Sequence, residues 1–172
     1  MTSNANFISF MIWPLLEKYE NLLVVQTFSK SRAMAGSRIG FAIGNEKLIS
    51  YLNDAKFSFN SYTMDSLTIQ LGAAAVKDAK YFKETVDKVI RTREWTKKEL
   101  TKLGFSFQDS QSNFIFAEHK ERKAEDIFNY LKSKDIFVRY FKKPRIDNYL
   151  RISIGTDQEM KTLIKELAEY LK

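Results

Sequence analysis

The segment Thr27-Phe-Ser-Lys-Ser-Arg-Ala-Met-Ala-Gly-Ser-Arg-Ile-Gly40 decides how the rest of this 172-residue chain is interpreted. It overlaps an apolar, β-rich run at Leu22–Phe28, which predicts a buried strand. A lysine at the end of such a strand is unusual, because a buried ammonium is costly unless it is paired or neutral. One use for Lys30 is a Schiff base with an aldehyde, for which desolvation lowers the pKa of the amine.

The residues around Lys30 suit an anion held beside its amine. Thr27 and Ser29 offer hydroxyls, Arg38 offers a bidentate guanidinium, and the small pair Ala35-Gly36 lets backbone come close. The chemistry of these residues therefore indicates a lysine beside a phosphate site. The alternative is a strand edge that carries an exposed lysine and a surface arginine.

Composition restricts the other kinds of chemistry. The chain has no cysteine, which excludes disulfides, thiolate metal sites and a cysteine nucleophile. The single histidine, His119, cannot form a histidine metal cluster, so no metal site is expected. Its charged neighbours, Lys120-Glu121-Arg122, predict a solvated turn rather than part of a catalytic triad.

The net charge of +7 raises the question of a nucleic-acid partner. Lysines and arginines are spread among nearly as many acids, and the densest patches, Lys97-Lys98 and Lys142-Lys143, are short. We interpret the charge as a basic surface that favours anionic small molecules, with no nucleic-acid partner. The apolar run Phe7–Leu16 is shorter than the roughly 20 residues of a membrane span. We therefore expect no membrane partner, and the lack of cysteine agrees with a cytoplasmic location.

Hydrophobic periodicity predicts two strands, three helices and then a strand-helix-strand-strand-helix unit. The expected elements are strands at 22–28 and 38–43, helices at 45–53, 63–79 and 81–103, strands at 105–107 and 113–117, a helix at 123–133, strands at 136–141 and 149–154, and a last helix opened by a capping box at 156–159. We expect Thr63 to cap the second helix, the aromatic stretch 57–62 to be irregular and Gly104 to end the long helix. This order predicts an α/β chain with a self-contained C-terminal subdomain. Two strands cannot form an independent sheet with covered edges, so the N-terminal third is expected to belong to something larger.

The segment 27–44 resembles the active-site signature of the fold-type I, class I/II aminotransferases, most closely the histidinol-phosphate aminotransferases. The signature is T-F-S-K, a small or aromatic stretch, A-G and then R-x-G, and the match is nearly continuous. Three later segments are similar to further motifs of the family and follow in the same order. Ser112-Asn-Phe114 resembles S-x-N-F, Ile136–Phe141 resembles G-I-x-V-R, and Leu150–Thr156 resembles L-R-I-S-x-G-T.

The resemblance implies an α/β fold, namely a C-terminal fragment of the pyridoxal-phosphate-dependent transferase fold, fold type I. It implies a remnant of the cofactor-binding large-domain sheet over 1–72 and a complete small α/β domain over 73–172. It also implies pyridoxal 5'-phosphate as cofactor. Lys30 would form the Schiff base and then act as general base, while Ser29 and Arg38 contact the cofactor phosphate and Thr27 supports them.

On the substrate side, the resemblance implies that Arg151 binds the α-carboxylate, that Arg139 reaches a substrate phosphate and that Asn113 lies near the site. The implied reaction is amino transfer between histidinol phosphate, or a similar amino acid, and 2-oxoglutarate, within histidine biosynthesis. The partners would be a small amino acid and a 2-oxo acid, in a homodimer of the full-length protein. Two alternatives stay open: a threonine-phosphate decarboxylase, which shares the lysine signature, and a non-catalytic domain that self-associates through its apolar N-terminal run.

The sequence departs from the family pattern before the lysine strand. The family carries an Asp-x-x-Tyr motif there, and its Asp pairs with the pyridinium nitrogen of the cofactor. The family spacing puts this motif at Met1–Asn4, where the sequence is Met-Thr-Ser-Asn. The resemblance covers almost the whole chain but only about half of the enzyme. We therefore expect a C-terminal fragment with little or no transaminase activity of its own.

Overall fold

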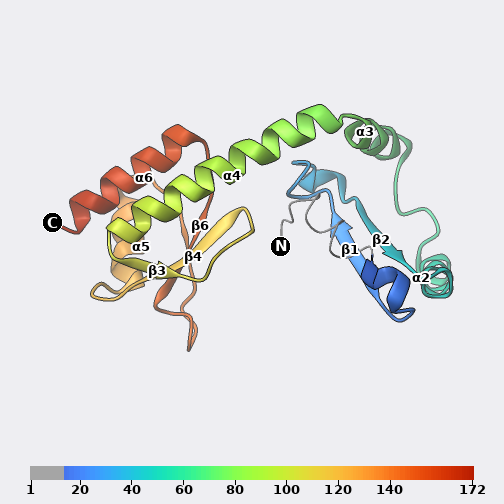
Figure 1. Ribbon diagram of the computed structural model, residues 1–172, viewed down its shortest axis with the longest axis horizontal. Helices are drawn as coiled ribbons and strands as arrows, with labels where there is room; N and C mark the ends of the chain where they lie inside the picture. Colours follow the sequence, from blue (N-terminus) through green and yellow to red (C-terminus); the bar gives the residue numbers. More distant parts are fainter. Residues whose placement is uncertain (1–13) are drawn as a thin grey trace. The chain divides into compact units, whose positions relative to one another are not determined.

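The computed structural model describes residues 14–172 of the chain (Figure 1). It divides the chain into two compact units, of which the first ends at Glu84 and the second covers Thr85–Lys172. The Met1–Asn4 segment, where the family motif is missing, lies outside the described residues. The expected division into 1–72 and 73–172 concerns the large and small domains of a whole family member and stays a prediction.

The first unit contains a two-stranded antiparallel sheet around the lysine segment. Strand β1 (Leu23–Thr27) pairs with β2 (Gly40–Gly44), and Thr27 stands opposite Gly40. The short 3-10 helix η1 (Ala35–Ser37) lies in the connection between the strands. Both strands confirm the prediction, but β2 begins later than expected. Arg38 has a left-handed backbone with a φ of 53°, which an extended strand excludes.

Two helices follow the sheet in the first unit before the long helix α4 begins. Asn45 caps α2 (Glu46–Phe59), and its side chain accepts a hydrogen bond of 2.9 Å from the Lys47 amide. The helix extends beyond its predicted end at 53, so the aromatic stretch at 57–59 is helical rather than irregular. The next helix, α3 (Ser66–Lys77), is capped by Asp65, which accepts from the Thr68 amide at 2.8 Å. The predicted cap at Thr63 was wrong.

The second unit packs helices on one face of a four-stranded antiparallel sheet with the order β3-β4-β6-β5. Its elements are the helix α4 (Ala79–Lys102, which begins before the unit does), strands β3 (Phe105–Phe107) and β4 (Phe114–His119), helix α5 (Ala124–Ser133), strands β5 (Arg139–Tyr140) and β6 (Tyr149–Ser153), and helix α6 (Asp157–Tyr170). All seven were predicted, although β5 is shorter than expected. Gly104 ends the turn after α4 with a φ of 83°, as a helix C-terminus favours.

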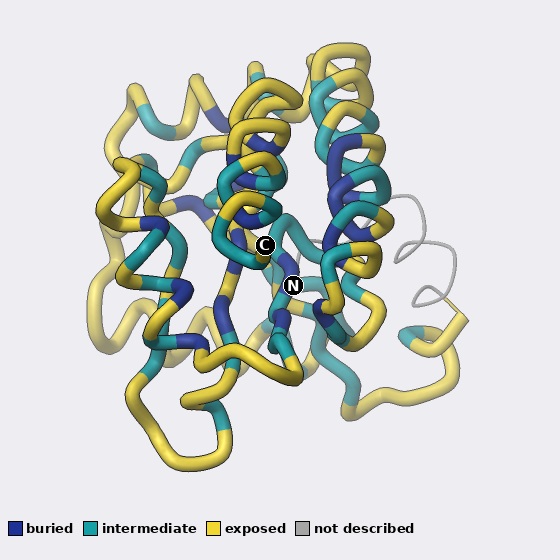
Figure 2. The backbone as a smooth tube through the Cα atoms, turned by 90° about the vertical axis from the view of Figure 1, so that its left-hand side faces the viewer, coloured by how far each residue is buried: buried dark blue, intermediate teal, exposed yellow. Residues whose placement is uncertain are grey.

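Strand alternation separates a buried face of this sheet from an open one. Leu150 and Ile152 of β6 are buried, whereas Arg151 and Ser153 between them are exposed. The buried residues of the strands pack with apolar residues of α4, α5 and α6, and Figure 2 shows buried positions along both the strands and the helices. The core consists of Leu100, Phe105, Ile115, Ala117, Ala124, Ile127, Leu131, Leu150, Ile152, Met160, Leu163 and Leu167. The helices therefore cover one face and leave Arg151 on the other.

His119 does not lie in a solvated turn, which corrects the prediction from its charged neighbours. It is the last residue of β4 and pairs with Phe105 of β3. Its Nε2 lies 3.0 Å from the carbonyl oxygen of Leu103, and its ring meets Phe105 edge to face at 5.0 Å between centroids. The charged turn begins one residue later, so His119 has a structural role where β3 leaves α4.

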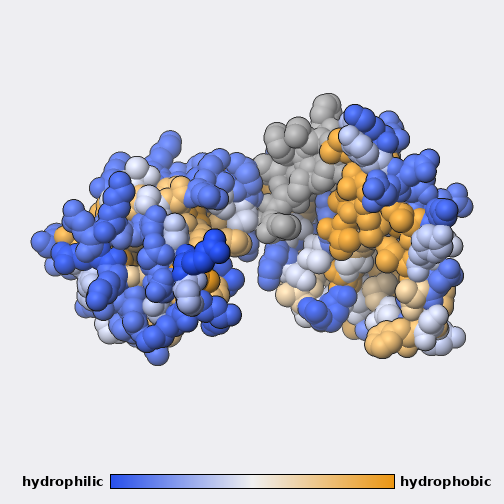
Figure 3. Space-filling view, turned by 90° about the horizontal axis from the view of Figure 1, so that it is seen from below, coloured by the Kyte–Doolittle hydropathy of each residue, from blue (hydrophilic) through white to orange (hydrophobic). Residues whose placement is uncertain are grey.

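The first unit exposes far more apolar surface than the second. Among the described residues, its exposed large hydrophobic side chains are Leu15, Tyr19, Val25, Phe41, Tyr51, Leu52, Phe57, Phe59, Tyr62, Met64, Leu67, Ile69, Leu71, Val76 and Tyr81, whereas the second unit has Phe137 alone. Figure 3 shows apolar side chains gathered in a broad patch on the first unit. This unit therefore offers a large apolar surface for packing. No helix within 14–172 combines the length and hydropathy that a membrane span needs.

Candidate functional site

Lys30 lies in a tight turn directly after β1. The Ala33 amide donates to the carbonyl oxygen of Lys30 at 3.1 Å, and the Met34 amide donates to that of Phe28 at the same distance. Ala33, which follows the two central residues of this turn, takes a left-handed φ of 53°. Phe28 is buried and its amide donates to the carbonyl oxygen of Ile39 at 3.0 Å. Phe28, two residues before Lys30, therefore anchors the turn.

The side chain of Lys30 is exposed, which corrects the expectation of a buried amine at a strand end. The strand ends at Thr27, and the polypeptide turns outward at Ser29, so the lysine leaves the apolar layer that holds Phe28. In the first unit as described, the amine is therefore accessible from solvent. Desolvation of Lys30 has to come from whatever covers this turn.

Arg38 lies on the far side of the same hairpin. Its Nη1 donates to the carbonyl oxygen of Ala35 at 3.2 Å, so the exposed guanidinium folds back over η1. Apart from its neighbours in the chain, no heavy atom lies within 4 Å of the position that a Cβ on Gly36 would take. The hairpin therefore combines a guanidinium with an open stretch of backbone, as a bound anion requires.

The residues of the hairpin fit pyridoxal 5'-phosphate. The phosphate of this cofactor needs hydrogen-bond donors and positive charge, which the half-buried Ser29 hydroxyl and Arg38 supply. Its aldehyde needs an accessible amine, which Lys30 supplies. Thr27 is exposed at the end of β1, opposite Gly40, where its hydroxyl can support the same group. The donor set thus matches both reactive parts of the cofactor.

Arg32, two residues after Lys30, lies in the same turn, and the sequence interpretation did not single it out. Its Nη1 donates to the carbonyl oxygen of Ala75 in the last turn of α3. Its Cζ lies 4.2 Å from the ring centroid of Phe82 and 5.4 Å from that of Phe28. The sequence signal that could have drawn attention to Arg32 is an arginine within a loop of small residues. The sequence alone does not show which carbonyl oxygen accepts its hydrogen bond.

Arg139 and Arg151 lie together on the open face of the second unit. They are register partners in the β5–β6 pair, and Phe116 of β4 stands opposite Arg151 on its other side. The Cζ of Arg151 lies 5.6 Å from the ring centroid of Phe114 and 5.9 Å from that of Phe141. The Cζ of Arg139 lies 5.4 Å from the Phe141 ring. Two exposed guanidiniums and an aromatic floor therefore form a candidate binding surface for anionic groups.

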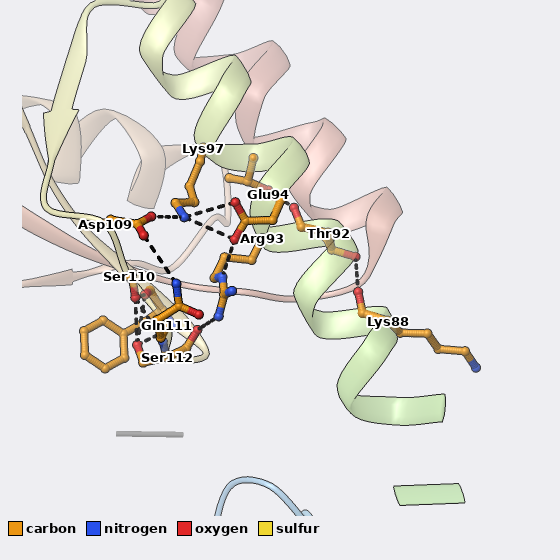
Figure 4. A network of polar contacts seen from close by, with 11 residues as sticks. Lys88, Thr92, Arg93, Glu94, Lys97, Asp109, Ser110, Gln111 and Ser112 are labelled. Carbon is orange, nitrogen blue, oxygen red and sulfur yellow. Dashed lines mark hydrogen bonds and ion pairs between the residues drawn. The ribbon is translucent and has the colours of Figure 1, made fainter. Parts of the chain in front are cut away.

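Asn113 precedes β4 and extends its pairing with β6, because its carbonyl oxygen accepts from the Ile154 amide at 2.9 Å. A polar network holds the loop before it (Figure 4). Arg93 of α4 is 4% exposed, and its Nη1 donates to the carbonyl oxygen of Ser112 at 3.1 Å. The hydroxyl of Ser112 donates to the carbonyl oxygen of Phe114 at 3.0 Å. The helix thus fixes the segment that carries Asn113.

Lys97 takes part in the same network rather than in a basic surface patch, which corrects the prediction. It is 9% exposed, and its Nζ pairs with Asp109 and lies 3.1 Å from the Glu94 carboxylate. The hydrogen bond and charge of Lys97 lower the pKa of Asp109. Burial raises the pKa of Glu94, but the bonds from Arg93 and Lys97 outweigh it and lower the pKa overall. Both carboxylates are therefore held ionised at neutral pH.

The structure gathers the predicted site residues into two groups, one in each unit. The first group is Thr27, Ser29, Lys30 and Arg38, and the second is Asn113, Arg139 and Arg151. Within residues 14–172, no group of three or more His, Asp or Glu side chains could hold a metal ion. These residues provide an amine, hydroxyls and several guanidiniums, which suit anionic substrates.

Comparison with known proteins identifies the family. The profile of the family "Aminotransferase class I and II" matches residues 1–167. The chain belongs to this family. It is 56% identical over 160 residues to the histidinol-phosphate aminotransferase of Brachyspira hyodysenteriae. The matched region covers 93% of this chain and 45% of that relative. It is 51% identical over 159 residues to that of Lactococcus lactis subsp. lactis, with 92% and 44% covered. The chain thus spans less than half the length of the curated relatives it matches, as expected.

Solved structures of the family agree with the fold. The chain is similar to the histidinol-phosphate aminotransferase of Sinorhizobium meliloti, solved in complex with pyridoxal-5'-phosphate, with a TM-score of 0.75 and 26% identity over 88% of this chain and 41% of that one. It matches the fold of the enzyme from Clostridium acetobutylicum with a TM-score of 0.82 and 21% identity, over 92% and 48% of the chains. The α/β fold is therefore that of part of an aminotransferase.

Proposed function

We propose that this chain is the lysine-bearing half of an aminotransferase that uses pyridoxal 5'-phosphate. The proposed reaction transfers an amino group between histidinol phosphate, or a similar amino acid, and 2-oxoglutarate, as a step of histidine biosynthesis. One observation carries the proposal: a single hairpin presents Ser29, the accessible Lys30 amine and Arg38. The names of the relatives and the cofactor in the S. meliloti structure support it.

The residues of the hairpin would hold the cofactor and move the proton. Ser29 and Arg38 would hold the phosphate, with Thr27 beside them, and the Lys30 amine would hold the aldehyde. When bound, pyridoxal phosphate supplies an electron sink for the bond that breaks at the substrate Cα. As a free amine, Lys30 would accept the proton from that carbon as general base.

The residues of the open sheet face would orient the substrate. Arg151 offers a planar fork that matches a carboxylate with two parallel hydrogen bonds. A carboxylate held in this way fixes which Cα bond stands in position for cleavage, and it selects deprotonation. Arg139 lies opposite Arg151 and offers a second fork for a phosphate. Asn113, fixed at the start of β4, lies beside the same substrate. The two guanidiniums thus favour a substrate with two anionic groups.

A second candidate function is decarboxylation of an amino acid that carries a phosphate, such as threonine phosphate. The facing Arg139 and Arg151 favour it equally, because that substrate also carries a carboxylate and a phosphate. The fold alone is shared with the L-threonine-O-3-phosphate decarboxylase of Porphyromonas gingivalis, with a TM-score of 0.71 and 22% identity. Product analysis separates the two reactions, because a transaminase retains the carboxylate and a decarboxylase releases CO₂.

The partners that we propose follow from the surface of the first unit. Its apolar patch (Figure 3) supports packing against the part of an aminotransferase that this chain does not span. The whole protein would be a homodimer in the cytoplasm, acting on a small amino acid and a 2-oxo acid. In this arrangement, the Lys30 turn is covered and the amine is desolvated, as its chemistry requires.

A hybrid protein tests the proposed function. The part of the B. hyodysenteriae relative that precedes its lysine strand, with its counterpart of the Asp-x-x-Tyr motif, replaces residues 1–13 of this chain, and amino transfer from histidinol phosphate to 2-oxoglutarate is measured. We expect turnover in the hybrid and none in its Lys30→Ala variant, because the variant lacks the amine. A soluble, folded hybrid that binds pyridoxal phosphate yet neither transfers the amino group nor releases CO₂ contradicts the proposal.

A further inference from the structure

We infer that Arg32 is a positioning residue for Lys30, a role that rests on the proposed function and deepens it. Arg32 follows Lys30 by two residues and lies in the same turn. Lys30 itself is exposed, whereas the guanidinium of Arg32 is half-buried among three partners. The turn is therefore held at Arg32, and Lys30 is presented from it.

The first partner of Arg32 is the C-terminal end of α3. The last four carbonyl groups of a helix have no partner within the helix, and cations near that end are favoured by its dipole. Arg32 Nη1 donates to one of these groups, the carbonyl oxygen of Ala75. The bond joins two segments that are 43 residues apart in sequence. A charge-assisted bond of this kind is stronger than a neutral one, so it is a firm anchor.

The other partners are two aromatic rings. The Cζ of Arg32 lies 4.2 Å from the ring centroid of Phe82 in α4 and 5.4 Å from that of Phe28, the buried residue where the strand ends. Both distances are within the range of a cation–π contact. A planar guanidinium can donate to a carbonyl while it lies against aromatic rings, whereas an ammonium is a compact point charge. The site is thus built for arginine rather than lysine.

Close packing beside the turn makes the anchor rigid. Gly72 of α3 is buried, and a Cβ there would lie 2.9 Å from Ile39 Cδ1 and 3.8 Å from Phe28 Cε2. The helix therefore approaches the hairpin closely at Gly72 and meets it again, through Arg32, at Ala75. Ala33, between the anchor and the rest of the loop, has a left-handed φ of 53°. With Arg32 held, the backbone at Lys30 keeps one position relative to Ser29 and Arg38.

The two arginines of this loop, Arg32 and Arg38, therefore have different roles. The guanidinium of Arg32 is engaged by a carbonyl and two rings, whereas Arg38 is exposed and folds over η1. Arg38 is thus the residue available to a phosphate, and Arg32 acts through Lys30. Loss of Arg32 should lower the rate at which Lys30 meets an aldehyde held at this hairpin, without changing how other lysines react.

The test measures the reaction of Lys30 with pyridoxal phosphate rather than turnover. The 172-residue chain is mixed with pyridoxal phosphate and reduced with borohydride, and peptide mass spectrometry gives the labelling rate of each lysine. Lys47, exposed at the start of α2 in the same unit, is the internal reference. We expect Lys30 to be labelled faster than Lys47 in the unchanged chain. Arg32→Leu should lower the Lys30-to-Lys47 ratio about tenfold, since it removes a charge-assisted bond and two ring contacts.

Two further variants keep the test specific. Arg32→Lys retains a charge for the rings but not the planar fork, so its ratio should lie between those of the unchanged chain and Arg32→Leu. Arg91→Leu removes an exposed arginine from the other unit and should leave the ratio unchanged. A ratio that stays the same in folded Arg32→Leu and Arg32→Lys overturns the positioning role. Equal labelling of Lys30 and Lys47 in the unchanged chain also overturns the positioning role, because the turn then gives Lys30 no advantage, whereas the hybrid protein tests the proposed function separately.

Discussion

Arg139 and Arg151 stand directly opposite each other across the β5–β6 pair, and both guanidiniums lie near the ring of Phe141. Like charges directly opposite each other destabilise a sheet. We therefore propose that the pair serves binding, because an anion between the guanidiniums would relieve their repulsion. The shared aromatic ring offers a surface against which both guanidiniums can lie.

The first prediction concerns this pair. Inorganic phosphate should raise the thermal unfolding midpoint of the chain, because it binds the folded state at the two guanidiniums. Arg139→Gln should remove most of that rise. Without phosphate, the same variant should be more stable by about 0.5 kcal/mol, because one of two facing like charges is gone. Lys132→Gln, which removes an exposed cation from α5, is the control. An equal phosphate effect in both variants would place the anion elsewhere.

The second prediction concerns acid stability. Lys97 lowers the pKa of Asp109 from its usual value of 3.8. A carboxyl whose pKa is lowered by folding stabilises the folded state above its usual pKa, and this contribution is lost as the pH falls through the lowered value. The free energy of unfolding should therefore fall more steeply below about pH 4 in the unchanged chain than in Asp109→Asn. Urea unfolding at a series of pH values checks it, and parallel curves would show that the pair contributes nothing.

The third prediction concerns the start of α6. The Thr156 side chain accepts from the Glu159 amide, and the Glu159 carboxylate accepts from the Thr156 amide, as a capping box requires. Thr156→Ala should lower the stability of the second unit by about 1 kcal/mol, a usual cost for a lost helix cap. Thr162→Ala, which alters an exposed hydroxyl within the same helix, should cost clearly less. Chemical denaturation distinguishes them, and equal costs would contradict a capping role.

The fourth prediction is that the isolated chain transfers amino groups poorly or not at all. The sequence at Met1–Asn4 lacks the Asp that the family places against the cofactor nitrogen, and the chain spans 45% of the B. hyodysenteriae relative. Without that carboxylate, the electron sink is weak even where Lys30 is in place. A coupled assay with histidinol phosphate and 2-oxoglutarate measures it. Steady turnover by the purified chain, absent in Lys30→Ala, would show that this half is sufficient.

Much of the fold was predictable because its signals are local. The capping box at Thr156, the stop at Gly104 and the period-2 strand at Tyr149–Ser153 act through near neighbours, and all three are found in the structure. The predicted cap at Thr63 was wrong because Asp65 has a stronger acceptor for the amides in the first turn of α3, which have no partner within the helix. The predicted end of α2 at residue 53 was wrong because aromatic residues, without Gly or Pro among them, do not end a helix.

The sequence indicates which residues form the candidate site, but it does not indicate their environment. The motif marks Lys30 and Arg38, yet burial depends on what packs around them, and Lys30 is exposed where a buried amine was expected. Lys97 looked like surface because its sequence neighbours are charged, whereas it is buried and pairs with Asp109, 12 residues away. Arg32 was missed for the same reason, because its carbonyl partner is distant in sequence. Long-range contacts of polar side chains leave no periodic pattern to detect.

The most direct test of the central claim is the site at which this chain reacts with pyridoxal phosphate. The chain is incubated with the cofactor, the near-visible imine absorbance is recorded, and the product is reduced and mapped by mass spectrometry. The hairpin geometry predicts an absorbance band that Lys30→Ala removes and Lys47→Ala does not, with Lys30 as the main modified residue. An unchanged band in Lys30→Ala, with label spread over the surface lysines, would contradict the claim that Lys30 is the reactive lysine of this family member.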